Sequence, residues 1–126
     1  MDYRTPLSKA RGLGSAKEGV HHWWAQRMTA LALTPLTIWF CFSVASLSTF
    51  SYDAFSAWLQ GPMNAALMLA VMIAGFYHGA IGLQVIIEDY VSNVPVRTAM
   101  IVLVKGAAWL LGLVGCMSVI LVALGG

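Results

Sequence analysis

Three side chains with the capacity for chemistry share one stretch of the sequence, the run from His78 to Tyr90. His78 stands among Ala, Gly, Met, Val, Ile and Leu residues, and Asp89 and Tyr90 follow eleven and twelve positions later. If the stretch is a helix, eleven residues rotate by about 20° past three full turns, which places His78 and Asp89 on one face, roughly 16 Å apart. A neutral imidazole in such a place is a good axial ligand for haem iron.

Glycines surround His78 on the same side of this expected helix. Gly82 and Val85 fall on the stripe of His78, and Gly75 and Gly79 flank it. The missing side chains leave room for a large flat group beside the imidazole. An imidazole at membrane depth is costly unless it has a partner, so a site is the default hypothesis for this face.

Each of these features also has a purely structural interpretation. A lone histidine in a membrane helix can hydrogen-bond to a neighbouring helix, an Asp–Tyr pair at a helix end can anchor that end in the interface, and glycines can serve helix packing. Arg27 can be a flanking anchor, and His21 and His22 can be plain interfacial residues. The residues taken singly leave these alternatives open.

The composition places these residues in a membrane protein. Of the 126 residues, 60% are hydrophobic and 10% are charged, with a mean hydropathy of +0.79, whereas soluble domains carry about 25% charged residues. Cys41 and Cys116 lie inside apolar runs without a Cys–His cluster, so neither a zinc site nor a disulfide framework is expected. The expected partner is a lipid membrane, and no nucleic acid is expected to bind.

Apolar helices must therefore position the chemistry. The hydrophobic pattern predicts an all-α membrane protein with three transmembrane helices, since the chain is long enough for three spans of about 20 residues. Residues 1–26 form a polar leader, and residues 27–126 form the three-helix anchor. The spans cover about 28–48, 63–87 and 98–124.

Prolines and glycines refine this pattern. Pro6 and the glycines of the leader argue against a long regular helix before the first span. Pro35 should kink the first span, and Pro95 should break the helix in the loop between the second and third spans. The first loop, from about residue 49 to 62, is aromatic and nearly uncharged, so we expect it to lie in the membrane interface.

The positions of the basic residues set the expected orientation. Apart from Lys105 inside the third span, every Lys and Arg lies in the leader, at its junction with the first span or in the second loop, and the first loop has none. The positive-inside rule then places the N-terminus in the cytoplasm and the C-terminus in the periplasm. His78 would lie in the inner half of the membrane, with Asp89 and Tyr90 at its cytoplasmic surface.

One histidine cannot coordinate haem iron from both sides, so a second axial ligand would have to come from elsewhere. The sequence has no other mid-membrane histidine, so a haem shared with another subunit is the simplest expectation. Arg27 lies on the membrane side where it could pair with haem propionates. The spacing H-x3-G-x6-D-Y, read as His78, Gly82, Asp89 and Tyr90, resembles the small hydrophobic membrane-anchor subunits of bacterial succinate dehydrogenase, respiratory complex II. The segment GVHHWWAQRMTALAL resembles that family's entry to its first span.

The resemblance implies roles for residues around a haem. His78 matches the axial ligand of haem b, which would be shared with a partner cytochrome b subunit that supplies the opposite histidine. Arg27 matches an arginine near the haem propionates and the quinone pocket. The family's propionate-side histidine could be His21 or His22.

The resemblance also implies a quinone site and further partners. Asp89 and Tyr90 match residues of the ubiquinone site, where Tyr90 would donate a hydrogen bond to a quinone carbonyl and Asp89 would relay protons. Flavoprotein and iron–sulfur subunits would complete the complex in the bacterial inner membrane and pass electrons from succinate to quinone, so this chain would not be catalytic alone. A non-redox membrane scaffold with a structural His78 is the alternative, and a transporter subunit with a His–Asp proton path is a third.

Reporter fusions test the orientation. Fusions after Ala57 and after Gly126 should both report an extracytoplasmic position, because the first loop lacks basic residues and the leader carries several. A fusion after Ser92, in the basic second loop, is the control and should report the cytoplasm. A cytoplasmic signal after Ala57 or Gly126 would overturn the three-span orientation.

Overall fold

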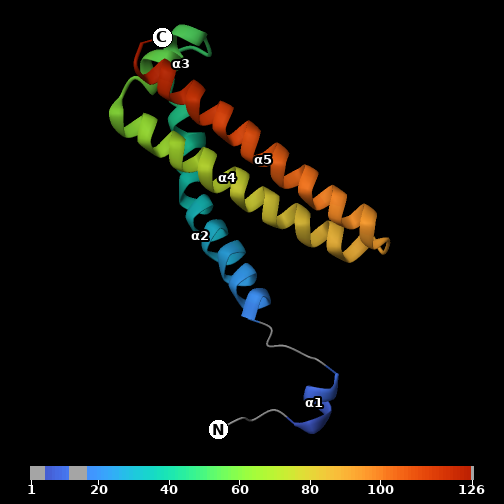
Figure 1. The fold of residues 1–126 in the computed structure, drawn as a ribbon. Coiled ribbons are helices and arrows are strands. Elements are labelled where there is room, and N and C mark those ends of the chain that lie inside the picture. Colours follow the sequence, from blue (N-terminus) through green and yellow to red (C-terminus); the bar gives the residue numbers. More distant parts are fainter. Residues whose placement is uncertain (1–4, 12–16, 126) are drawn as a thin grey trace.

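The structure is a computed structural model that describes residues 5–11 and 17–125. Its elements in chain order are α1 (Pro6–Ala10), α2 (Lys17–Ala45), α3 (Tyr52–Leu59), α4 (Pro62–Tyr90) and α5 (Val94–Ala123) (Figure 1). No strand occurs in the described residues, and three helices are long and apolar enough to cross a membrane. The predicted all-α fold with three spans is confirmed, while the orientation of the termini stays a prediction.

The first span is longer at its N-terminal end than the sequence suggested. Helix α2 begins at Lys17 and not near residue 28, so the last part of the expected polar leader is helical. Gly19 is the one described glycine inside this helix, and a Cβ atom built there would meet nothing within 4 Å. A single glycine inside a helix costs only about 1 kcal/mol relative to alanine, so the helix can form through it. Helix α2 also continues through Pro35 to Ala45. His21 and His22 therefore belong to the same rigid element as the first span.

The turn between α4 and α5 is shorter than predicted. Pro95 was expected to break the helix in this loop, but it lies in the first turn of α5. Proline fits that position because the first helical N–H groups have no intrahelical partner anyway. The side chain of Asn93 caps α5 by accepting a hydrogen bond from the backbone N–H of Val96 at 3.2 Å. Only residues 91–93 separate the two helices.

The first loop contains a short helix, α3, that packs on the bundle. Ser51 caps it by accepting the backbone N–H of Ala54 at 3.2 Å. Trp58 of α3 stacks on Trp39 of α2, with 5.7 Å between ring centroids, and Leu59 is only 2% exposed. Helix α3 also contacts α4 and α5, and it lies at the same end of the molecule as the C-terminus (Figure 1).

Helix α4 is the centre of the bundle. It lies beside α5 along most of its length, and α2 crosses it on another face (Figure 1). Very few side chains of the described residues are buried, namely Leu59, Ile81, Ile87 and Val119. Large apolar side chains are exposed along all three long helices. In a membrane these surfaces face lipid or other subunits, so their exposure does not carry the cost that it would have in water.

Two glycines of α5 allow the close approach of α4 and α5. A Cβ atom at Gly112 would touch the ring of Phe76 at 3.5 Å, and a Cβ atom at Gly115 would overlap the methyl group of Met72. Small residues at helix contacts let backbones approach closely, which is the main source of packing energy in a membrane.

Substitution of Gly115 should loosen this helix pair. The terminal methyl of Met72 can move aside for one added methyl group, so Gly115→Ala should change the unfolding free energy little, whereas Gly115→Leu adds three more carbon atoms at this contact and should cost about 1–3 kcal/mol. Unfolding of the purified chain from detergent micelles with SDS, followed by tryptophan fluorescence, measures it. Gly106→Leu is the matched control, since a Cβ at Gly106 meets nothing within 4 Å. Equal stability losses in the two variants would contradict the packing role of Gly115.

Candidate functional site

The site is built where α2 crosses α4, around the imidazole of His78. His78 projects from α4 towards α2 and is half-buried. Its Nδ1 lies 3.0 Å from the hydroxyl oxygen of Thr29, and its Nε2 lies 3.5 Å from the amide nitrogen of Gln26. Thr29 and Gln26 are three residues apart on α2, so side chains on one face of that helix contact both nitrogens of the imidazole.

The contacts of Thr29 indicate which ring nitrogen of His78 carries the proton. The Thr29 hydroxyl lies 2.8 Å from the carbonyl oxygen of Ala25 and 3.1 Å from that of Gln26. A hydroxyl has one proton to donate and two lone pairs to accept with. If that proton goes to Ala25, Thr29 accepts the Nδ1–H of His78. The Nε2 atom of His78 then carries the lone pair, which can bind a metal ion.

Gln26 covers this lone pair only loosely. The 3.5 Å separation between its amide nitrogen and His78 Nε2 is at the outer limit of a hydrogen bond. Its Oε1 is buried without a hydrogen-bond partner. A Cβ atom at Gly82 would lie 3.3 Å from the same amide nitrogen, so the glycine makes the room in which this side chain sits. The Gln26 amide has little to hold it and can rotate away.

A groove opens beside His78 along α2. It has a volume of about 420 Å³, and its lining consists of small or aliphatic side chains of α2 together with the imidazole: Ala30, Leu33, Thr34, Thr37, Ile38 and His78. On α4, Cβ atoms at Gly75 and Gly79 would meet nothing within 4 Å. The backbone is therefore open at these two positions, although neither glycine lines the groove, whereas Gly82 faces Gln26.

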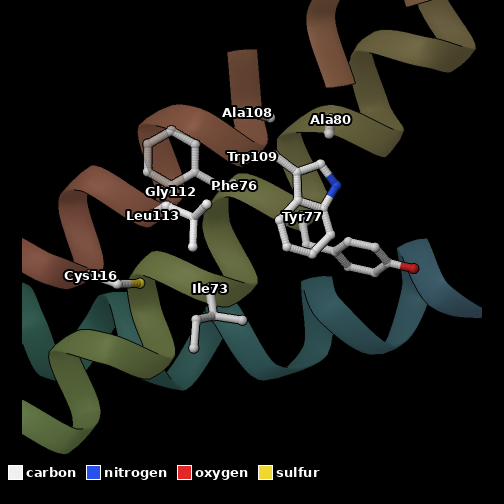
Figure 2. Close-up of a pocket in the computed structure, with 9 residues that line it drawn as sticks. All are labelled: Ile73, Phe76, Tyr77, Ala80, Ala108, Trp109, Gly112, Leu113 and Cys116. Atoms are coloured by element: carbon white, nitrogen blue, oxygen red, sulfur yellow. The ribbon is translucent and has the colours of Figure 1, made fainter. Parts of the chain in front are cut away.

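A second cavity lies on the opposite side of α4, between α4 and α5. It has a volume of about 170 Å³ and an apolar lining: Ile73, Phe76, Tyr77, Ala80, Ala108, Trp109, Gly112, Leu113 and Cys116. Figure 2 shows that the hydroxyl of Tyr77 points away from the other lining residues. The lining of this cavity contains no imidazole, carboxylate or basic side chain, so the His78 groove is the stronger candidate site.

The other candidates on α2 lie outside this contact. The guanidinium of Arg27 lies over the ring of Trp23, 5.5 Å from its centroid, and is exposed. His21 is exposed. His22 is half-buried, and its Nε2 is buried without a partner. Since His22 is four residues before Gln26, the two share one stripe of α2, and both carry an orphaned polar atom.

Asp89 and Tyr90 occupy the far end of α4. Tyr90 is 84% exposed and Asp89 is also exposed. Neither side chain makes a hydrogen bond or ion pair within the described part of the chain. The structure does not bring them to His78, because about three helical turns separate them on one continuous helix. Their chemistry depends on what packs against this end of α4.

Thr29 and Gln26 were missed as site residues in the sequence. Both stand beside Arg27 in the segment that enters the first span, and polar side chains in an apolar helix are a usable signal. Their pairing with His78, 49 and 52 positions away, depends on how α2 crosses α4. Among the described residues no group of three His, Cys, Asp or Glu side chains gathers, so His78 is isolated from other strong ligands.

Three apolar helices define a multi-pass membrane protein. The family model of the succinate dehydrogenase/fumarate reductase transmembrane subunit matches residues 1–123, and the chain belongs to this family. It is similar to the succinate dehydrogenase hydrophobic membrane anchor subunit of Rickettsia bellii, with 36% identity over 82% of this chain and 83% of the relative. The anchor subunit of Paracoccus denitrificans is 37% identical over 80% of this chain and 78% of the relative.

The comparisons confirm the resemblance found in the sequence. This chain is a membrane anchor subunit of the succinate dehydrogenase/fumarate reductase family, so a membrane and other subunits of the complex surround it. Its bacterial relatives are consistent with the predicted location in a bacterial inner membrane.

Proposed function

We propose that this anchor subunit helps to hold haem b in the membrane and forms part of the site where ubiquinone is reduced with electrons from succinate. The observation that carries the haem assignment is the difference between the two ring nitrogens of His78. Nδ1 lies 3.0 Å from the Thr29 hydroxyl, whereas Nε2 has only a contact of 3.5 Å with the Gln26 amide. A metal-binding histidine normally donates its other ring N–H to an acceptor in this way.

The residues around His78 fit a haem. Rotation of the loosely held Gln26 amide would free Nε2, and the groove between His78 and the side chains of α2 leaves room beside the imidazole. Arg27 is exposed and could pair with a propionate, and His22 or His21 could lie near the same group. When bound, the haem supplies one-electron transfer inside the membrane.

The second axial histidine and the remaining contacts would come from partners. A cytochrome b subunit would cover the open groove beside His78 and supply the opposite ligand. Flavoprotein and iron–sulfur subunits would deliver electrons from succinate. The groove beside His78 is open on the surface of this chain, so a partner subunit can reach the imidazole there.

Tyr90 and Asp89 would act on the quinone. The exposed Tyr90 hydroxyl has no hydrogen-bond partner among the residues that the structure describes, so it can donate a hydrogen bond to a quinone carbonyl and orient the ring. The exposed carboxylate of Asp89, one residue before it, can take up and release protons at the membrane surface.

One observation also favours the alternative of a non-redox scaffold. The Thr29–His78 hydrogen bond joins α2 to α4, which is what a structural histidine would do. A histidine kept only for packing should have both nitrogens well paired, however, and Nε2 is not. The two functions differ in whether His78 binds iron.

Substitution of His78 separates them. In the assembled complex, His78→Ala should convert the low-spin haem to a high-spin form or lose it, because one axial ligand is gone. Absorption and EPR spectra of the purified complex measure the change. Gln84→Ala, on the same helix but hydrogen-bonded to Glu88, is the control and should keep the wild-type spectrum. An unchanged low-spin haem in His78→Ala would remove His78 as a ligand.

Substitution of Tyr90 tests the quinone site. Tyr90→Phe deletes one hydroxyl and keeps the ring, so succinate oxidation with a soluble artificial acceptor should stay near normal. Quinone reduction should fall severalfold, and by up to roughly 10²-fold if the hydrogen bond strengthens as the quinone gains charge. Steady-state assays with both acceptors measure this.

Tyr52→Phe is the matched control for Tyr90→Phe. Tyr52 is also exposed but lies in α3, at the opposite end of α4 from Tyr90 (Figure 1). Its substitution should change neither rate. If Tyr90→Phe lowers both activities equally, the hydroxyl serves assembly, and if it changes neither, the quinone site lies elsewhere.

A further inference from the structure

We propose that Thr29 is a positioning residue for the axial ligand: it holds His78 in the tautomer with a proton on Nδ1 and fixes the angle of the ring. The inference rests on the proposed haem-binding function. It adds a residue on α2 whose side chain would touch only the ligand and not the iron.

Distances support the proton assignment. The Thr29 hydroxyl is closest to the Ala25 carbonyl, at 2.8 Å, and this bond to the residue four positions earlier is common for threonine inside helices. With its only proton used there, the hydroxyl oxygen accepts from His78 Nδ1 at 3.0 Å, an ordinary hydrogen-bond length. In the other tautomer the proton would be on Nε2, and the polar group beside that atom is the side chain of Gln26, at 3.5 Å.

Rigidity supports a role in orientation. Thr29 belongs to the continuous helix α2, its branched side chain has few rotamers, and it is half-buried against α4. Its oxygen is held between the Ala25 carbonyl and the imidazole, so the ring of His78 is tied to the backbone of another helix. Rotation of the ring about its own side chain would break this bond.

The same bond should tune the bound iron. An Nδ1–H that donates to an oxygen makes the imidazole a better electron donor, and such outer partners typically change metal affinity by roughly 10- to 100-fold. A stronger donor favours ferric over ferrous iron. Unlike the Gln26 contact, the Thr29 bond uses the nitrogen that does not face the metal, so it persists when the ligand position is filled.

The test is the haem midpoint potential in the assembled complex. Thr29→Val keeps the shape and deletes the hydroxyl, so the preference for ferric iron should fall and the potential should rise, by about 59 mV for each tenfold change in that preference. The EPR g values of the low-spin haem should shift as the ring turns. Thr29→Ser keeps the hydroxyl and should restore both readouts. Thr98→Val removes a comparable hydroxyl, bonded to the Val94 carbonyl at 3.0 Å, and should change neither.

An unchanged potential and EPR spectrum in Thr29→Val overturns the inference, as does an equal shift in Thr98→Val or a lack of rescue by serine. A different result would contradict the proposed function, namely a low-spin haem spectrum that is unchanged in His78→Ala. If His78→Ala loses that spectrum and Thr29→Val does not alter it, only the inference about Thr29 is wrong.

A second measurement does not need haem or assembly. The full chain has three histidines, so ¹⁵N-histidine NMR in detergent micelles gives few signals, and His78→Ala identifies those of His78. The proposal expects a protonated Nδ1 and an unprotonated Nε2 for His78, with a mixture of tautomers in Thr29→Val. A protonated Nε2 in the wild-type chain would overturn the assignment.

Discussion

The contact between His78 and α2 is the constraint on which the rest of this structure depends. A ring with two polar nitrogens cannot lie unpaired within an apolar helix pair without a large cost in free energy. Thr29 satisfies one nitrogen, and this requires α2 to cross α4 at the level of His78. The crossing places Gln26 against Gly82 and opens the groove beside Ala30 and Thr34. The polar pairing and the free space are thus two results of one helix crossing.

Two faces of helix α4 make different kinds of contact. Towards α5 it packs through Met72 and Phe76 against glycines, and the cavity on that side is apolar. Towards α2 it presents His78 and leaves Nε2 short of a partner. Tight packing on one face holds the helix still, while loose packing on the other leaves room for a ligand. The anchor function needs the first face, and the proposed haem function needs the second.

The sequence alone predicted the class of fold, because long apolar runs are strong local signals. It also singled out His78 as an isolated polar residue, whose role as a ligand stays a prediction. The ends of helices were harder. Pro95 can end one helix or begin the next, and only the cap at Asn93 distinguishes the two. The first span was predicted from its apolar run, whereas α2 also includes polar residues before that run and begins at Lys17. Thr29 and Gln26 were missed because their roles come from a contact across some fifty residues, which no local spacing reveals.

The small number of buried side chains has a consequence for the supply of this subunit in the cell. Only four residues of the described chain are buried within it, so most of its apolar side chains are left for contacts with lipid or with other subunits. Partners that bind only the folded form add stability by mass action, in proportion to the logarithm of their concentration. A copy made in excess of the other subunits gains none of this and is exposed to membrane proteases. We therefore expect the abundance of this subunit to follow that of its partners.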